Sequence, residues 1–270
     1  MGQPVAGNPT QYMMEKCFVA AGLEWRYLTL EVPGENLADA LAGMKAMGFR
    51  GGNFTIPHKV EVIQHLDGLS EAAELMGAVN CINRVGDGFI GENTDGKGFV
   101  QSLKDVTDPE GKKILIFGAG GASRAIAVEL GLSKVADITI VNRDEGRGQS
   151  LATLLNDRVK VPSRWIAWDG NHEVPEDIDI VINATSIGLN DASAMVPVDV
   201  SSLKENMIVS DVIFNPPETM FLKAAESQGC TTLDGLGMLV NQGVIGFKIW
   251  TGVDPDAAVM REALEEFLNI

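Results

Sequence analysis

Cysteine is scarce in this chain. Only Cys17, Cys81 and Cys230 occur, they lie far apart, and no CxxC pair is present. An odd, dispersed set provides neither a disulfide framework nor the ligand spacing of a zinc site. We therefore expect a protein of a reducing compartment, the cytoplasm, without a metal site.

Positive charge is also in short supply. Lys and Arg total 21 against 37 Asp and Glu, which gives a net charge of −16 at pH 7. An acidic surface disfavours nucleic acid and anionic membranes, so any bound anion must be held by local devices such as helix N-termini or single Arg and Lys residues. We expect a small-molecule partner, and neither nucleic acid nor a membrane. The sequence leaves a monomer and a homodimer equally open.

Long hydrophobic runs are missing as well. No apolar stretch approaches the roughly 18 residues of a membrane-spanning helix. The first residues lack the basic head and apolar core of a signal peptide. We therefore expect neither a secreted nor a membrane-spanning protein, and 270 residues are enough for two domains.

The first hundred residues alternate short extended patterns with helical ones, which predicts an α/β domain. A Gly-Asp-Gly turn then separates two further apolar runs, and a helix is expected to begin after Thr94-Asp95-Gly96. The predicted strands are 26–32 and 50–57, and the predicted helices are 36–48 and 60–66.

A linker rich in charge and turn formers, residues 104–113, precedes a second domain. The runs 114–117 and 178–182 are almost wholly apolar, as in strands covered on both faces, which indicates a parallel sheet flanked by helices. Two helical segments without an intervening strand end the chain. We predict a substrate-binding domain of residues 1–103, to which 237–270 return, and a Rossmann-type NAD(P)-binding domain of residues 104–236.

A glycine-rich loop follows the first predicted strand of the second domain and opens an apolar helix. This context makes a GxGxxG-like pattern informative, because glycines let the backbone approach a pyrophosphate that helix N–H groups then bind. A plain glycine-rich turn is the alternative. The residues of the loop are Gly118, Ala119, Gly120, Gly121, Ala122 and Ser123.

The next predicted strand ends in Asn142-Arg143-Asp144, where a dinucleotide-binding domain meets the adenosine ribose. Arg143 suits a 2′-phosphate, whereas Asp144 could accept the free ribose hydroxyls of NAD. On the rule that an acid selects NAD and an arginine NADP, we predict NADP as the cofactor, with NAD possible.

Lys59 attracts attention because it follows Pro57 at the predicted start of a helix. A cation is unfavourable there, since the helix dipole is positive at its N-terminus. A lysine oriented by a carboxylate could instead move a proton to and from a hydroxyl group. The alternative is an ordinary surface lysine.

Other polar residues accompany Lys59. Asn80 lies within an apolar run and Asp95 at a turn, although each could simply cap or satisfy backbone groups. Gln242 lies in an apolar helical stripe and needs a buried polar partner, which a bound polyol would supply.

These motifs, in their order along the chain, resemble those of the shikimate dehydrogenases and their quinate-using relatives. The matching stretches are NFTIPHK, GAVNCI, GENTDGKG, GAGGAS, INATSIG, DVIFNPPET and GLGMLVNQGVIGFKIWTG. The resemblance implies NADP-linked interconversion of 3-dehydroshikimate and shikimate, a step of the chorismate pathway to aromatic amino acids, in a cytoplasmic enzyme.

The resemblance also implies roles for single residues. Lys59 would be the catalytic lysine and Asp95 its partner, and no metal would take part. The implied substrate-binding residues are Asn8, Thr10, Thr55, Asn80 and Gln242, and the implied cofactor contacts include Thr185, Ser186 and Gly235.

The chain departs from the family pattern near its start and in the second domain. Asn8 and Thr10 stand where the family has two serines that grip the substrate carboxylate, Phe214 replaces a tyrosine, and Cys81 replaces a threonine. These changes leave quinate or another cyclic hydroxy acid open as the substrate. A ligand sensor that has lost turnover and a folate-linked dehydrogenase are the more distant alternatives.

Overall fold

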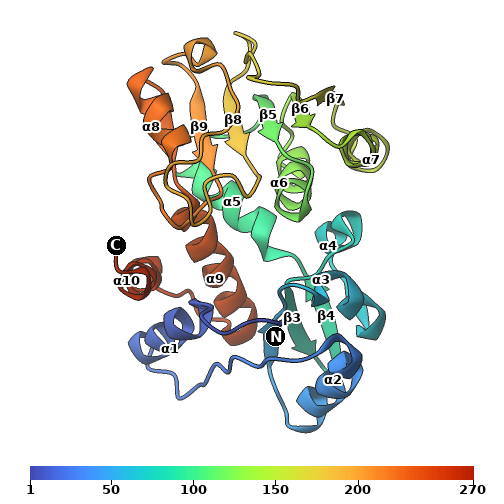
Figure 1. Cartoon of the computed structure of the whole chain (residues 1–270). Helices are drawn as coiled ribbons and strands as arrows, with labels where there is room; N and C mark the ends of the chain where they lie inside the picture. Colours follow the sequence, from blue (N-terminus) through green and yellow to red (C-terminus); the bar gives the residue numbers. More distant parts are fainter. The chain divides into compact units, whose positions relative to one another are not determined.

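The computed structural model describes residues 1–270, which divide into two compact units (Figure 1). Unit 1 comprises residues 1–94 and 240–270, and unit 2 comprises residues 95–239. The division falls inside two helices, α5 (Thr94–Lys104) and α9 (Gly235–Thr251). The boundaries drawn from the sequence, after residue 103 and before residue 237, stay predictions.

Unit 1 is built on a four-stranded mixed sheet with the strand order β1-β3-β4-β2. Strands β3 and β4 form the predicted hairpin around Gly86-Asp87, and β1 pairs antiparallel with β3. The core of this sheet includes Leu41, Phe54 and Phe89, all buried. The strands are β1 (Gly51–Asn53), β2 (Gly68–Leu69), β3 (Cys81–Val85) and β4 (Gly88–Glu92).

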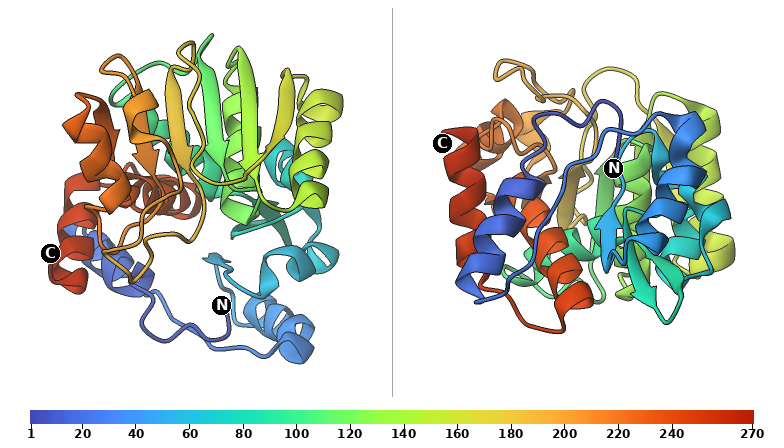
Figure 2. Two further views of the ribbon diagram at one scale, coloured as in Figure 1. Left: turned by 45° about the horizontal axis from the view of Figure 1, so that its top comes forward. Right: turned by 90° about the horizontal axis from the view of Figure 1, so that it is seen from below.

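Helices complete unit 1, and α1 lies beside α10 in both figures of the whole chain (Figures 1 and 2). The side chain of Asp256 caps the first turn of α10, and that of Ser70 caps α4. The helices are α1 (Thr10–Ala20), η1 (Gly34–Asn36), α2 (Leu37–Ala46), α3 (His58–Glu61), η2 (Val62–His65), α4 (Glu71–Met76) and α10 (Ala257–Leu268).

One predicted strand of unit 1 is wrong. Residues 26–32 run extended, but only Glu31 forms a bridge, with Gly2. A strand needs a run of ladder partners, and a single bridge does not provide one. Side chains hold the segment instead: the Tyr27 hydroxyl donates to Asn53 Oδ1 at 2.8 Å, and the Thr29 amide donates to Gln11 Oε1.

Unit 2 contains the predicted parallel sheet, with the strand order β10-β9-β8-β5-β6-β7 (Figure 2, left). Its central strands are covered on both faces, which explains why the runs in β5 and β8 are almost wholly apolar. The strands are β5 (Lys113–Phe117), β6 (Asp137–Asn142), β7 (Ser163–Ala167), β8 (Ile180–Asn183), β9 (Ile208–Asp211) and β10 (Thr231–Leu233).

The helices of unit 2 pack against this sheet, α6 on β5 and β6, α7 on β6 and β7, and α8 on β9 and β10. Asp144 caps α7 and Thr219 caps α8 through side-chain oxygens. The further elements are α6 (Gly121–Leu132), α7 (Glu145–Leu154), the π-helical turn η3 (Leu155–Val159), η4 (Val200–Ser202) and α8 (Met220–Ser227).

This strand order is that of a doubly wound dinucleotide-binding domain, in which the direction of winding reverses between β5 and β8. Ligands of such sheets bind beyond the carboxyl ends of the strands at the reversal. The predicted fold class, an α/β protein with a Rossmann-type domain, is confirmed. None of the helices combines the length and the apolar character that crossing a membrane requires.

Gly51 provides a test of packing in unit 1. A Cβ atom added at Gly51 would lie 2.3 Å from Trp250 Nε1 and 2.4 Å from the Ile82 carbonyl oxygen, which are joined by a 2.9 Å hydrogen bond. Gly51→Ala should therefore lower the free energy of unfolding by about 2 to 4 kcal/mol, measured by urea denaturation.

Gly34→Ala is the matched control, because nothing lies within 4 Å of its added Cβ. Its free energy of unfolding should stay within about 0.5 kcal/mol of the parent value. Equal losses in the two variants would contradict the packing argument.

Candidate functional site

A cavity of about 450 Å³ lies over the glycine-rich loop of unit 2. The loop connects β5 to α6, as predicted, and Gly118 through Ala122 line the cavity. An added Cβ at Gly120 or Gly121 would meet no atom within 4 Å, so packing does not require glycine there. Side chains at these two positions would instead occupy the space in which a pyrophosphate approaches the backbone, and the loop therefore fits a dinucleotide.

Gly118 and Ser123 shape the loop from below. Gly118 has φ +106, and its added Cβ would lie 2.9 Å from the Ala184 carbonyl oxygen. Ser123 is fully buried and donates to the Gly118 carbonyl oxygen at 2.7 Å. Ser123 thus closes the turn between strand and helix and does not line the cavity.

The end of β6 supplies one wall of the cavity through Asn142 and Arg143. Asp144 does not line it: one carboxylate oxygen caps α7 by accepting from the Arg147 amide at 2.9 Å, and the other lies 4.0 Å from Arg147 Nε. The Asn142 side chain donates to the Asp144 carbonyl oxygen. The carboxylate that could have served the ribose of NAD thus caps α7 outside the cavity lining, and the exposed Arg143 lines the cavity.

The ends of β8 and β9 form the opposite wall through the loops that follow them. Thr185 and Ser186, both predicted from the sequence, line the cavity here. Beneath them the buried Asp211 carboxylate accepts from Asn183 Nδ2, the Ile213 amide and Thr219 Oγ1 at 2.8 to 3.0 Å. Burial raises the pKa of Asp211, and the three donors oppose that shift.

Sequence reasoning did not assign several residues of this cavity. Most of them are apolar, and an apolar side chain gives no indication that it binds a ligand. Their position just after predicted strands was the one feature of the sequence that could have identified them. Conversely, Gly235 does not line the cavity, since its Cβ position lies 2.4 Å from the Ile213 carbonyl oxygen and the glycine serves close packing. The unassigned lining residues are Trp168, Ala184, Leu189, Val212, Ile213 and Phe214.

Lys59 lies in the first turn of α3, as predicted, and its side chain is partly buried. The helix itself is shorter than expected: it ends at Glu61 and continues as the 3₁₀ turn η2 to His65. A dipole built from so few aligned peptides is small, which weakens the argument from the dipole. The buried His58 anchors this turn through a 2.7 Å hydrogen bond between Nε2 and the Val32 carbonyl oxygen.

Main-chain hydrogen bonds bring the residues near Lys59 together within unit 1. The Val79 amide donates to the Lys59 carbonyl oxygen at 2.7 Å, and the Phe54 amide donates to the Asn80 carbonyl oxygen. Thr55 follows Phe54 directly and is partly buried. Three of the predicted residues, Thr55, Lys59 and Asn80, therefore lie on neighbouring backbone segments.

Asn80 directly precedes β3, and its amide fixes the start of α5. Its Oδ1 accepts from the Thr94 amide at 2.7 Å, and its Nδ2 donates to Thr94 Oγ1 at 3.0 Å. Asp95, the next residue, lies in the first turn of α5 and is partly buried. Asn80 thus determines where the chain carrying Asp95 leaves the sheet of unit 1.

Asn8 and Thr10 lie at the beginning of α1 and are partly buried. Asn8 Oδ1 accepts from the Thr10 amide at 2.9 Å, which leaves the amide NH₂ group of Asn8 and the hydroxyl of Thr10 for a ligand. Gln242 lies on α9 and is 7% exposed. No hydrogen bond within the protein engages its side-chain amide, and its contact with a substrate stays a prediction.

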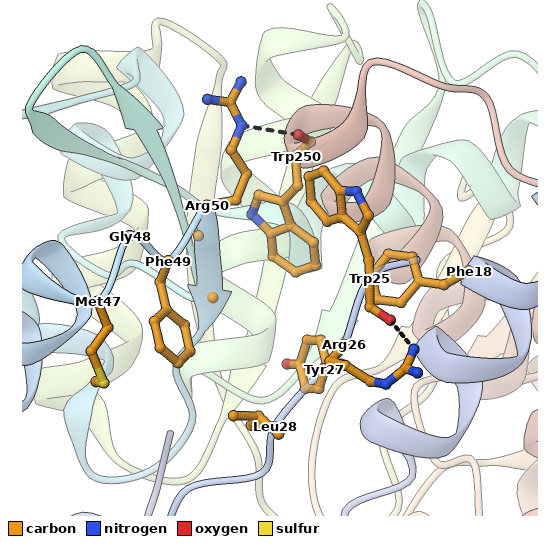
Figure 3. Close-up of a pocket in the computed structure, with 12 residues that line it drawn as sticks. Phe18, Trp25, Arg26, Tyr27, Leu28, Met47, Gly48, Phe49, Arg50 and Trp250 are labelled. Atoms are coloured by element: carbon orange, nitrogen blue, oxygen red, sulfur yellow. Dashed lines mark hydrogen bonds between the residues drawn. The ribbon is translucent and has the colours of Figure 1, made fainter. Parts of the chain in front are cut away.

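A second cavity, of about 510 Å³, lies in unit 1 between residues 25–28 and 47–52 (Figure 3). Its walls are aromatic, with Phe18, Trp25 and Trp250 among them, and it includes none of the predicted substrate residues. Its two arginines each donate a hydrogen bond to a main-chain oxygen, Arg26 to the Trp25 carbonyl and Arg50 to the Trp250 carbonyl. Figure 3 draws both bonds as dashed lines.

Comparison with known proteins agrees with the two units. Residues 1–82 match the family model of the shikimate dehydrogenase substrate-binding domain, and residues 101–214 match that of shikimate/quinate 5-dehydrogenase. Residues 235–265 match the model of the shikimate 5-dehydrogenase C-terminal domain.

Similar proteins align over almost the whole chain. A shikimate dehydrogenase (NADP⁺) of Methanopyrus kandleri is 40% identical, over 100% of this chain and 94% of that protein. The ligand-free structure of a 5-ketofructose reductase of Gluconobacter sp. strain CHM43 is 53% identical with a TM-score of 0.97, over 98% of this chain and 96% of that chain.

A third relative is a shikimate dehydrogenase solved in complex with NADP⁺. It is 37% identical with a TM-score of 0.90, over 99% of this chain and 93% of that chain. The resemblance that the motifs indicated is therefore confirmed, and this chain belongs to the shikimate dehydrogenase family.

Proposed function

We propose that this chain transfers a hydride between NADP and a ketone next to a hydroxyl-bearing carbon, as in the interconversion of 3-dehydroshikimate and shikimate. The observation that carries the proposal is the glycine-loop cavity, with Arg143 exposed at its rim and Asp144 engaged as a helix cap. The nicotinamide supplies the hydride chemistry, and the protein must orient the ketone and handle one proton.

Lys59 is the proposed proton donor to the oxygen that becomes a hydroxyl, and Asp95 is its proposed partner. A buried or partly buried lysine can serve as an acid or base when a carboxylate orients it. Thr55, Asn80 and Gln242 are proposed to contact the substrate. The free amide of Gln242 suits a hydroxyl, since an amide can both donate and accept a hydrogen bond.

Membership of the family favours 3-dehydroshikimate as the ketone. Relatives named shikimate dehydrogenase (NADP⁺) are up to 40% identical to this chain over nearly its full length. That substrate carries a carboxylate, which the family grips with two serine hydroxyls near the N-terminus. Asn8 and Thr10 can both still donate to a carboxylate, but both are larger than serine.

A neutral keto sugar is the second candidate, and two observations favour it. The 5-ketofructose reductase is 53% identical to this chain, more than the shikimate dehydrogenases compared above. An amide and a hydroxyl at positions 8 and 10 pair readily with sugar hydroxyls, which both donate and accept, whereas a carboxylate only accepts. Among the two ketones, these observations favour the keto sugar.

The proton-transfer role of Lys59 is tested by Lys59→Ala. Removing a general acid lowers turnover by about 10² to 10⁴-fold, so NADPH oxidation with an accepted ketone should fall by that factor. The dissociation constant for NADPH, measured by its fluorescence, should change little.

Lys45→Ala is the control for Lys59→Ala. Lys45 belongs to the same unit and pairs with Asp67 on the surface, at 2.9 Å. Its loss should leave turnover unchanged. Full activity of Lys59→Ala would remove Lys59 from the mechanism.

The substrate is tested by comparing 5-ketofructose with 3-dehydroshikimate as oxidants of NADPH. We expect kcat/KM to be at least about tenfold higher for the keto sugar, because discrimination by one polar subsite is of that order or larger. The opposite order would identify 3-dehydroshikimate as the substrate, and oxidation by neither ketone would contradict the proposed function.

The role of positions 8 and 10 is tested by the double variant Asn8→Ser and Thr10→Ser. Two smaller hydroxyl side chains should raise kcat/KM for 3-dehydroshikimate and lower it for 5-ketofructose. The measurement is the ratio of the two kcat/KM values. An unchanged ratio would place substrate selection elsewhere.

Cofactor choice is tested by Arg143→Ala. Loss of a guanidinium from the 2′-phosphate should raise KM for NADPH by about tenfold and leave KM for NADH unchanged, since only NADPH carries that phosphate. Parallel changes for the two cofactors would show that Arg143 does not read the 2′-phosphate.

A further inference from the structure

Two fully buried polar side chains lie beneath the wall that β8 and β9 contribute to the cofactor cavity. Asn183 and Asp211 end these strands and are direct cross-strand neighbours, 0% and 1% exposed. Neither lines the cavity. The residues that follow each of them do, Ala184 through Ser186 after β8 and Val212 through Phe214 after β9.

The Asp211 carboxylate is the centre of this cluster. Its Oδ1 accepts from Asn183 Nδ2 at 2.9 Å and from the Ile213 amide at 3.0 Å, while its Oδ2 accepts from Thr219 Oγ1 at 2.8 Å. All three partners are donors, so an acceptor-only group matches them. These bonds connect the residues after β9 to Thr219, the cap of α8.

Asn183 extends the same network to the other loop. Its Oδ1 accepts from the amide of Thr185 at 3.2 Å and from the Thr185 hydroxyl at 2.7 Å. Its Nδ2 also donates to the Ile187 carbonyl oxygen at 3.2 Å. A main-chain bond from the Asn190 amide to the Asn215 carbonyl oxygen then links the two loops directly.

We propose that Asp211, acting through Asn183 and Thr219, is a positioning residue for the nicotinamide half of the cofactor. In a doubly wound sheet the first strands hold the adenosine half, and the strands beyond the reversal hold the other half. The proposal rests on the proposed use of NADP. Asp211 lies outside the cavity, and in this proposal it fixes the two loops, after β8 and after β9, against which the nicotinamide binds.

Core packing alone does not explain the choice of an aspartate at this position. Packing in this strand is supplied by Val209, which is fully buried in the core of unit 2. Ser210, the neighbour of Asp211, is equally buried, and its hydroxyl has no partner, so a polar group there is tolerated without forming a network. Burial raises the pKa of Asp211, and the hydrogen bonds that the two loops donate to its carboxylate oppose this shift.

The test compares Asp211→Ala with Asp211→Asn by titrating each purified full chain with NADPH and following its fluorescence. Asp211→Ala frees both loops and should raise the dissociation constant by at least about tenfold, the effect of losing one well-placed interaction. In Asp211→Asn the Oδ1 bonds remain, and the Thr219 hydroxyl can turn to accept from the new amide. This conservative variant should bind more tightly than Asp211→Ala and within about threefold of the parent, since the bonds from Asn183 and from the Ile213 amide are kept.

Two substitutions in the same strand separate positioning from stability. Val209→Ala lowers the thermal midpoint by removing core packing but leaves the network intact, so NADPH affinity should not change. Ser210→Ala removes a buried hydroxyl that has no partner and should change neither quantity. Equal losses of affinity in Val209→Ala and Asp211→Ala would overturn the proposal, as would unchanged affinity in Asp211→Ala.

If Asp211→Ala does not fold, the same bond can be removed at its donor, Thr219, by comparing Thr219→Val with Thr219→Ser. Only valine removes the bond to Asp211, so only valine should weaken NADPH binding, and equal binding by the two variants would overturn the proposal. The measurement needs no substrate, and an unsuitable ketone therefore leaves it intact. A parent chain that does not bind NADPH would overturn this proposal together with the proposed function.

Discussion

The hydrogen-bonded ladder of β5 with β6 and β8 is the constraint on which the cofactor site depends. Because these strands are parallel, their carboxyl ends lie at one edge of the sheet, and every loop that lines the cavity leaves from that edge. Gly118 has its positive φ at this point and lies against the Ala184 carbonyl of the next strand. A side chain at position 118 would separate the two strands that define the site.

Polar side chains buried beneath the surface then fix the loops that the ladder leaves free. Asn183 and Asp211 do this in unit 2, and Asn80 with Thr94 does it in unit 1, where it sets the start of α5 and hence of the segment carrying Asp95. Each of these amides and carboxylates has its partners within the protein. Asn80 is thus fixed in place where it is proposed to meet the substrate, whereas Asn8 keeps its amide NH₂ group and Thr10 its hydroxyl for a ligand.

The elements predicted correctly are those whose pattern lies within one short stretch of the sequence. The runs of β5 and β8 are apolar because both faces of these strands are covered, and this pattern predicted them. The glycine loop was predicted because a strand pattern precedes it and a helix pattern follows it. Residues 26–32 have a strand-like pattern, but the partner that a strand requires comes from elsewhere in the chain. The cavity residues Val212 and Ile213 could not be assigned, since an apolar side chain carries no sign of its position at a strand end.

Because the chain is strongly acidic, the binding of an anionic ligand depends on where single Arg and Lys residues lie. A net charge of −16 repels an anionic cofactor and an anionic substrate alike, and a diffuse field therefore cannot attract either. At the cofactor cavity the repulsion is offset locally, by backbone N–H groups at the start of α6 and by Arg143. At positions 8 and 10 the chain offers only neutral donors, with no arginine or lysine between them. A neutral ligand is not repelled by this field, whereas a carboxylate can bind only where local donors offset the repulsion, as the backbone N–H groups and Arg143 do at the cofactor cavity.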